Sequence, residues 1–369
     1  MKVVHLLPAL EQGGVETVVC DLNRALVAAG CESVVISRGG RLVERIERDG
    51  GRHIALDLKS KNPLTYFMRA LRLRKVMRAE RPDLVCAHSR VPAWLFVWAN
   101  RALRLPWITY AHGANSVSRY SAVMTRGDLV ITPSRFLADF LKANYGTLEE
   151  RLRVIPNAVD TVRFDPDRLD AAFIAEKCRE WGIAPGDHVY MVIGRITPVK
   201  GLEALIRDFA AGRYPPDGAK LVIVGGADRD HQPFLERLQA LAASLCPTES
   251  TADYGNRRQS AAIIFAGQQS KIPECLAIAD EVISANTTKP ESFGLSVIEA
   301  YAMNRPVRAR RFGGVAEVMA AVEAAGAPSL RDAVLSLYGI DKFTERTLAA
   351  YREVARRASQ SARTSHETS

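Results

Sequence analysis

Residues 188–201 read HVYMVIGRITPVKG, and this stretch shows the structural unit from which the chain is built. An apolar run fills 188–193, a glycine and polar residues follow, and a helical pattern occupies 201–211. A short apolar run that ends in a glycine turn is typical of a buried strand. Strands that are apolar on both faces and alternate with helices form parallel sheets covered on both sides. The stretch therefore predicts an α/β fold.

The same alternation recurs along nearly the whole chain. It predicts strands at 3–7, 33–37, 83–87, 107–111, 128–132, 152–155, 188–193, 220–224, 262–266, 281–285 and 306–309. These exceed what one open parallel sheet usually holds, so we expect two sheets. The Asp/Pro-rich residues 157–170 separate the two series, and the polar residues 245–260 lack periodicity and predict a surface loop.

Composition narrows the class of protein. With 47% hydrophobic and 25% charged residues, the chain reads as a soluble globular protein. The longest apolar run, 91–99, is far shorter than the roughly 20 residues that span a bilayer. The apolar stretch at the start of the sequence ends at Pro8 and Glu11, so it does not have the pattern of a signal peptide. The six cysteines are scattered along the chain. We therefore expect a cytoplasmic protein without a disulfide framework or structural zinc site.

The net charge of +9 lies entirely in residues 1–165 and is densest at 59–81, where eight basic residues stand against Glu80. Apolar residues recur there at helical spacing and predict an amphipathic helix: Leu64, Phe67, Met68, Leu71 and Val76. This helix could be a solvated outer helix whose apolar face packs on its sheet. It could instead be attracted to an anionic membrane or an acidic acceptor. No nucleic-acid-binding motif accompanies the charge, so nucleic acid is not an expected partner.

Three strand-to-helix turns hold unusual residues, and parallel sheets bind ligands at such turns. The first turn is Gln12-Gly13-Gly14, whose glycines let backbone approach a ligand at a helix N-terminus. The second places the cations Arg195 and Lys200 after a buried strand, where they can bind phosphate.

The third turn holds two carboxylates, Glu291 and Glu299, eight residues apart across the start of a helix. At about 1.5 Å per residue they are separated by about 12 Å along the axis. A nucleotide sugar has hydroxyls at both ends and phosphates in the middle, and would fit this span.

Read together, these segments resemble glycosyltransferase family 4, the retaining transferases of GT-B fold, from residue 1 to about residue 319. The resemblance rests on GGVE at 13–16, PNAVDTVRF at 156–164, GRITPVKG at 194–201, EAYAMNRPV at 299–307 and RFGGVAEV at 311–318. It implies an α/β, GT-B chain with two Rossmann-like parallel-sheet domains facing across a cleft. Residues 1–160 would form the acceptor-side domain and 161–345 the donor domain. Residues 346–369 would form a C-terminal helix and tail that could pack back on the N-terminal domain.

The resemblance also implies an activity. The chain would move a sugar from a nucleotide sugar, with a UDP-sugar favoured, to a hydroxyl of a glycan or glycolipid. Catalytic residues would be Glu291, His112, Arg195 and Lys200. Donor-binding residues would be Gly13, Gly14, Arg195, Lys200, Gln268, Gln269, Glu291, Phe293, Gly294, Leu295 and Glu299. In the mechanism proposed for the family, the departing phosphate helps deprotonate the acceptor, so no cofactor or metal is expected.

The acceptor side is basic, with Arg90, Asn115 and Arg119 as candidate contacts. It suggests an anionic acceptor of the cell envelope, such as a lipopolysaccharide core or a phospholipid-linked glycan. The protein would then work in the cytoplasm, at the inner face of the membrane.

Several features depart from the family or leave alternatives open. Asn304 replaces a glycine, Arg308 and Arg310 occupy a strand that is normally apolar, and 320–329 is short. A catalytically inactive nucleotide-sugar-binding protein of the same fold is therefore the alternative. Asp228 and Asp230 could hold Mg²⁺, but Arg195 and Lys200 already supply positive charge. An epimerase does not share these motifs, and an oxidoreductase is disfavoured because the glycine fingerprint is missing.

Overall fold

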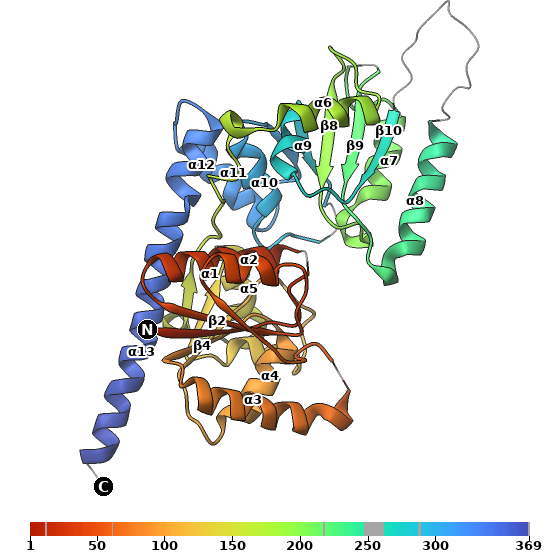
Figure 1. Ribbon diagram of the computed structural model, residues 1–369. Coiled ribbons are helices and arrows are strands. Elements are labelled where there is room, and N and C mark those ends of the chain that lie inside the picture. Colours follow the sequence, from red (N-terminus) through yellow and green to blue (C-terminus); the bar gives the residue numbers. More distant parts are fainter. Residues whose placement is uncertain (12, 61, 217, 247–261, 287–288, 368–369) are drawn as a thin grey trace, which may run out of the picture. The chain divides into compact units, whose positions relative to one another are not determined.

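The computed structural model describes residues 1–11, 13–60, 62–216, 218–246, 262–286 and 289–367 (Figure 1). Most of the loop predicted at 245–260, and Gln12, lie outside the described residues. The chain divides into two compact units. The first is Met1–Ala158 together with Tyr338–Ser369, and the second is Val159–Leu337.

The first unit contains a seven-stranded parallel sheet with the order β3-β2-β1-β4-β5-β6-β7. The direction of winding reverses between β1 and β4, which makes the sheet doubly wound. The strands are β1 (Lys2–Leu6), β2 (Glu32–Ser37), β3 (Arg52–Ala55), β4 (Leu84–Ala87), β5 (Trp107–Tyr110), β6 (Leu129–Thr132) and β7 (Leu152–Val154).

Helices cover both faces of this sheet (Figure 1). One face carries α1 (Gly14–Ala28) and α2 (Val43–Arg48), and the other carries α3 (Tyr66–Glu80) and α4 (Arg90–Asn100). The chain's last helix, α13 (Ile340–Glu367), contacts α1, β4 and β5. The remaining elements are α5 (Arg135–Tyr145), η1 (Pro63–Thr65), η2 (Ser121–Thr125) and η3 (Glu149–Arg151).

Strand alternation sorts the core of the first unit into two layers. Val4 and Leu6 of β1 pack in a cluster with Leu73 of α3 and Phe96 of α4. His5, between them in sequence, therefore points to the opposite face. There its neighbours include Tyr351 of α13, whose ring centroid lies 6.5 Å away.

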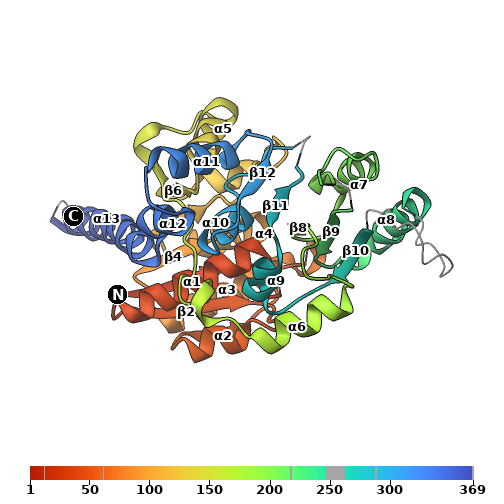
Figure 2. The same ribbon diagram turned by 90° about the horizontal axis from the view of Figure 1, so that it is seen from above.

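The second unit repeats the plan with five parallel strands in the order β10-β9-β8-β11-β12. Its strands are β8 (Val189–Ile193), β9 (Lys220–Val224), β10 (Ala262–Gly267), β11 (Glu281–Ser284) and β12 (Val307–Ala309). α7 (Leu202–Ala210) and α8 (Gln232–Leu245) pack together on one face, and α6 (Ala171–Glu180) and α9 (Ile272–Ile278) on the other (Figure 2). The other elements are α10 (Leu295–Ala302), α11 (Gly314–Ala324), α12 (Leu330–Tyr338), η4 (Pro166–Arg168), η5 (Pro198–Lys200) and η6 (Arg229–His231).

Each of the eleven predicted strands is present, with its ends within a residue or so of those expected. The sequence pattern missed β3, an edge strand whose residues RHIA give no apolar run. Two departures from the family also find a physical reason. Asn304 adopts the expected left-handed conformation, with φ 54°. Arg308 lies on the edge strand β12 and makes a two-pronged contact with Glu281, at 3.0 and 2.9 Å.

The alternative in which the apolar stripe of the basic helix packs on its sheet is wrong for four of its five residues, since only Val76 packs against the core. A helix does occupy Tyr66–Glu80, but its residues Phe67, Met68 and Leu71 do not pack on the sheet, and Leu64 lies before it in η1. Leu64, Phe67, Met68 and Leu71 are 87%, 59%, 56% and 58% exposed. The buried side chains of α3 are instead Arg69, Ala70, Leu73 and Met77. Arg69 satisfies its buried guanidinium by donating to the carbonyls of Ser60 and Asn62.

In the described part of the chain, no helix is both long enough and apolar enough to cross a membrane.

Candidate functional site

Each sheet has one place where a ligand is expected, the point at which its winding reverses. In the first unit this point lies beyond the carboxyl ends of β1 and β4, and in the second beyond those of β8 and β11. We describe the two points separately.

The turn after β8 is tied to the turn after β9. Gly194 N donates to Val224 O at 3.0 Å, and Ile196 N donates to Gly226 O at 2.9 Å. A Cβ on Gly225 would lie 1.8 Å from the carbonyl oxygen of Gly194, so only glycine permits this approach. The backbone on either side of Arg195 is therefore held, while its side chain is exposed.

Lys200 and Glu291, two of the predicted catalytic residues, meet at the carboxyl edge of the second sheet. The Lys200 ammonium forms an ion pair with Glu291 Oε1. Asn286 Nδ2 donates to the same oxygen at 2.9 Å. The Glu291 side chain is only 15% exposed and that of Lys200 31%, so solvent screens the pair incompletely. The arrangement presents a fixed carboxylate beside a fixed cation.

Two glycines explain how the backbone of Glu291 is held. Gly314 N donates to Glu291 O at 2.8 Å, and Gly313 forms a β-bridge with Glu291. A Cβ on Gly314 would lie 2.2 Å from Ser292 O, and one on Gly313 would lie 2.6 Å from Pro290 Cβ. In the sequence this glycine pair stands out only as part of the motif at 311–318. Adjacent glycines at a helix start were the available signal for this close approach.

The predicted donor helix is α10. It begins at Leu295 after Gly294, which has φ 99° and would bring a Cβ within 2.8 Å of Val315 Cγ2. Phe293 is buried, and Glu299 is partly buried within the helix. The first turn of such a helix leaves amide N–H groups for an anion.

Gln268 and Gln269 follow β10, at the same carboxyl edge. Gln269 Nε2 donates to Ala266 O at 2.5 Å, so its side chain is tied to the end of its own strand. The side chain of Gln268 lies beside Gly226, where an added Cβ would meet its Oε1 at 3.5 Å.

The carboxylate of Asp228 is engaged in hydrogen bonds within its own turn. It accepts hydrogen bonds from the backbone N of His231 at 3.1 Å and pairs with the His231 ring at 2.5 Å. These contacts, the ring contact first, hold the pKa of Asp228 below its ordinary value, with a smaller effect from Arg195. Asp228 thus caps η6.

His112, the predicted contact of the first unit, lies at the end of a row of three histidines. Its Nε2 lies 2.9 Å from Nδ1 of His88, whose Nε2 lies 3.0 Å from Nδ1 of His5. Tyr110 stacks on His112 with ring centroids 4.4 Å apart and planes 3° from parallel. Burial lowers the pKa of His5 and of His112 to about 3, and lowers that of His88 well below its usual range. In the sequence His5 looks like an ordinary strand residue, so it was not among the predicted site residues.

The remaining first-unit candidates lie in nearby turns. Arg90 donates to Ser121 Oγ at 3.2 Å, and its guanidinium lies 5.4 Å from the Tyr120 ring centroid. Asn115 donates to Gly113 O at 3.3 Å, whereas Arg119 is exposed. Gly14 opens α1, and Gly13 O accepts from Thr17 N at 3.0 Å.

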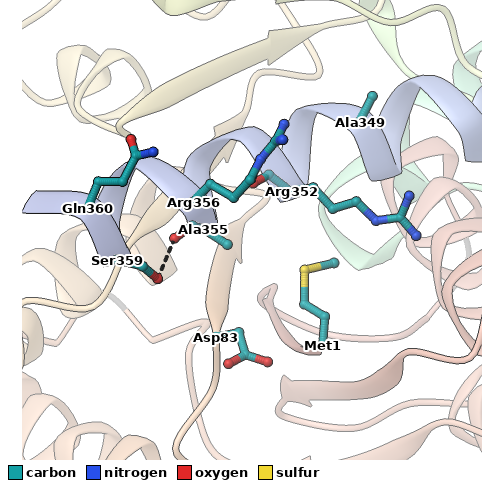
Figure 3. A pocket seen from close by; sticks show the side chains of 8 residues that line it. All are labelled: Met1, Asp83, Ala349, Arg352, Ala355, Arg356, Ser359 and Gln360. Atoms are coloured by element: carbon teal, nitrogen blue, oxygen red, sulfur yellow. Dashed lines mark hydrogen bonds between the residues drawn. The ribbon is translucent and has the colours of Figure 1, made fainter.

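A cavity of about 750 Å³ lies away from these residues, at the amino ends of β1 and β4 (Figure 3). Met1 and Asp83 line one side of it. The other side is α13, with Ala349, Arg352, Ala355, Arg356, Ser359 and Gln360. None of the predicted site residues lines it.

Among the described residues, one group of three side chains has metal-ligand atoms close together. These are His5, Cys86 and His88, with atoms within 4.8 Å of one another. His5 and His88 are engaged in the histidine row, and Cys86 Sγ accepts from Tyr351 Oη at 3.5 Å. Burial raises the pKa of the Cys86 thiol to about 12, which disfavours the thiolate that binds metals.

Sequence comparison finds glycosyltransferases that are similar to this chain. The relative D-inositol 3-phosphate glycosyltransferase of Acidothermus cellulolyticus is 32% identical over 199 residues, 52% of this chain and 40% of the relative. Alpha-monoglucosyldiacylglycerol synthase of Streptococcus pneumoniae is 28% identical over 261 residues, 65% of this chain and 54% of the relative. The chain thus spans about half the length of these curated relatives.

A solved structure of Anabaena HepE in complex with UDP and glucose matches with a TM-score of 0.76 at 19% identity. The match covers 96% of this chain and 100% of that one. With the two doubly wound sheets, it confirms the predicted GT-B fold class.

Two family models divide the chain between them. The model Glycosyltransferase Family 4 matches residues 12–163, and the model Glycosyl transferases group 1 matches residues 173–329. The predicted resemblance is confirmed, and the chain belongs to the group 1 glycosyltransferases, with a family 4 N-terminal half.

Proposed function

We propose that this protein is a retaining, metal-independent glycosyltransferase that uses a nucleotide sugar, with a UDP-sugar favoured. The observation that supports this most directly is the Lys200–Glu291 pair, held by Asn286 and the Gly313–Gly314 turn at the switch point of the second sheet. A phosphate leaving group needs fixed positive charge, and a transferred sugar needs a fixed hydrogen-bond acceptor. The pair offers both within one contact.

Each residue then has a chemical task. Arg195 and Lys200 stabilise the negative charge that develops on the leaving diphosphate, aided by the N–H groups at Gly294 and Leu295. Glu291 accepts from hydroxyls of the transferred sugar, and Glu299 from the ribose. His112 contacts the donor sugar, while Gln268 and Gln269 lie near the base.

The reaction exchanges one bond for another on the same face of the sugar. The bond between the anomeric carbon and the phosphate oxygen breaks, and the acceptor oxygen bonds to that carbon. The acceptor proton passes to the departing phosphate. No protein nucleophile, metal or cofactor is required in this scheme.

The acceptor we propose is a glycan or glycolipid of the cell envelope. One relative is named for an inositol phosphate and another for a glucosylated diacylglycerol. An inositol phosphate and a diacylglycerol, the hydroxyl compounds that these names imply, are the acceptors to test first, together with the lipopolysaccharide core expected from the sequence.

The test begins with a panel of nucleotide sugars and thermal unfolding, since a ligand that binds the native state raises its stability. The donor that stabilises most is incubated with each acceptor, and NMR reads the anomeric configuration of the product. A product with the donor's configuration supports the proposal, and an inverted product contradicts it. Donor binding without transfer or hydrolysis would favour the inactive binding protein.

The exposed face of α3 supports a second part of the proposal, contact with an anionic membrane from the cytoplasmic side. Its exposed apolar side chains come first along the helix, and the exposed basic residues Arg72, Lys75 and Arg78 follow on the same stripe. Phe67 also meets Trp98 edge-on at 5.2 Å, and Arg101 lies 4.0 Å from the Trp98 ring centroid. Apolar, aromatic and basic groups together suit a lipid interface.

Vesicle sedimentation tests this part. We expect binding to anionic vesicles at low salt that weakens as salt is added. Each basic residue contributes about 1 kcal/mol near such a surface, so reversing Arg72, Lys75 and Arg78 to Glu should abolish binding. Arg74 is left unchanged because it donates to carbonyls of Trp98 and Ala99.

The matched control reverses three exposed cations of the second unit, Arg168, Arg207 and Arg213. Equal losses in both variants would show a net-charge effect, and no binding at either salt would refute membrane contact.

A further inference from the structure

The histidine row of the first unit joins three neighbouring strands. His5 lies on β1, His88 follows β4 and His112 follows β5, and these strands are adjacent in the sheet. The two contacts of the row, 3.0 Å and 2.9 Å, are both hydrogen-bond distances between ring nitrogens. Only His112 has a task in the proposed reaction.

Counting protons shows that the row must have a direction. Burial lowers the pKa of each ring, so all three are neutral near pH 7. A neutral imidazole has one N–H donor and one acceptor nitrogen. His88 uses both of its nitrogens in the row, so it donates to one neighbour and accepts from the other. The bonds therefore run either from His5 to His112 or from His112 to His5.

The buried end of the row, His5, distinguishes between these two directions. Nε2 of His5 is buried and has no hydrogen-bond partner among the described residues. If the row ran from His112 inward, the only proton of His5 would stand on this nitrogen as an unsatisfied donor. If it runs outward, His5 donates from Nδ1 and buries only a lone pair. Orphaned buried N–H groups are the rarer case, so the outward direction is favoured.

We propose that His5 and His88 form a one-directional hydrogen-bond relay that fixes His112 as the neutral tautomer protonated on Nδ1. His5 and His88 are then positioning residues, and the parallel ring of Tyr110 holds the plane of His112. The inference rests on the proposed function for the contact between His112 and the donor sugar. It adds that His112 acts there as a hydrogen-bond donor through Nδ1. The acceptor proton is left to the departing phosphate.

The direct test is ¹⁵N NMR of the resting protein, labelled at its seven histidines. The ring nitrogen shifts report which nitrogen bears the proton, and single-histidine variants assign the signals. We expect His112 and His88 protonated on Nδ1, and both neutral from pH 5.5 to 8. A His112 signal with the proton on Nε2 would overturn the proposal.

A matched pair of variants tests the role of His5. In His5→Asn the amide Nδ2 stands where the ring Nδ1 was and can still donate to His88, whereas His5→Leu removes the donor. We expect His5→Asn to keep the His112 tautomer, and His5→Leu to give a mixture of tautomers. Turnover should fall on the order of tenfold in His5→Leu with KM little changed, and largely recover in His5→Asn.

Three outcomes separate this proposal from its rivals. Unchanged His112 tautomer in a folded His5→Leu variant would overturn the relay. One equivalent of zinc in the purified protein, lost in both His5→Leu and Cys86→Ala, would also overturn it, because the metal would take the nitrogens that the relay uses. The tautomer is read without substrate, so the expected signals in a protein that transfers no sugar would refute the proposed function alone.

Discussion

The two sheets share one winding plan, yet the residues at their switch points differ in kind. Beyond β8 and β11 stand formal charges, Lys200 paired with Glu291, and Arg195 exposed nearby. Directly after β4 stands His88, with His5 behind it on β1, and burial keeps both rings uncharged. In the proposed function and relay, the same backbone fixes a ligand contact in two ways, by ion pairing at one edge and by tautomer selection at the other. In the proposed function, the positive charges of Lys200 and Arg195 lie at the edge where the donor diphosphate would bind.

Removing the Lys200 charge from the second unit should have the largest effect. Lys200→Met should lower kcat by about 10²–10³, the effect of losing one preorganised group that stabilises transition-state charge. It should also destabilise the second unit by about 1–3 kcal/mol, because Glu291 stays partly buried without its cation. Steady-state kinetics and urea unfolding measure the two effects.

The control is Arg207→Met, which removes an exposed cation paired with Glu203 at 3.2 Å on the same unit. Surface pairs of this kind contribute about 0–1 kcal/mol, so both readouts should change little. Equal losses of kcat and of stability in the two variants would contradict the special role proposed for Lys200.

The two carboxylates should separate binding from turnover. Glu299→Gln keeps the size but weakens acceptance of ribose hydroxyls, so donor affinity should fall by about 1–3 kcal/mol. Glu291→Gln should chiefly lower kcat, because the partner proposed for Glu291 is the sugar that moves. Calorimetry with the nucleotide alone separates the two variants further, because only Glu299→Gln should weaken nucleotide binding. Negligible effects from both variants would contradict the assignment.

Much of this contrast could be predicted from the sequence, because local patterns define strands and turns. The predicted strand 220–224 coincides with β9, and the turns holding Lys200 and Glu291 were placed at strand ends. The pairing of these two residues, 91 positions apart, depends on strand order and only the structure reveals it. The histidine row could not be predicted for the same reason, because His5 and His88 are 83 positions apart in the sequence.

The error on α3 has a different cause. Helical spacing shows which residues share a face, and it grouped Leu64, Phe67 and Leu71 correctly. It does not show which face packs on the sheet, and the prediction assumed that the larger apolar face is buried. Here Ala70, Leu73 and Met77 fill that position instead. A second set of apolar residues at helical spacing on the opposite face, Ala70, Leu73 and Met77, was the signal that the assumption overlooked.

A fall in pH should lower the stability of the first unit more than that of the second. Burial lowers the pKa of His5 and His112 to about 3 in the folded state, against about 6.5 when unfolded. Below pH 6.5 the unfolded chain therefore binds protons that the folded unit does not, and stability is lost as pH falls. The loss is about 1 kcal/mol per histidine between pH 7 and pH 5.5.

Hydrogen exchange can measure this unit by unit. Peptides from β1, β4 and β5 should lose protection over that pH range, while those from β8 and β9 should change less. Equal loss in both units would show that the histidine row does not control acid sensitivity.

The smallest expected effect is that of chelation. Excess EDTA should leave donor affinity and kcat within about twofold of their starting values, because cations and helix N–H groups neutralise the diphosphate. Asp228, the residue best placed to bind Mg²⁺ by its sequence, already accepts from the backbone and ring of His231. Asp228→Asn should accordingly affect η6 more than turnover. A loss of activity in EDTA that Mg²⁺ restores, and that Asp228→Asn reproduces, would instead give the second unit a metal. The contrast between its charged edge and the neutral edge of the first unit would then rest on an ion as well as on Lys200.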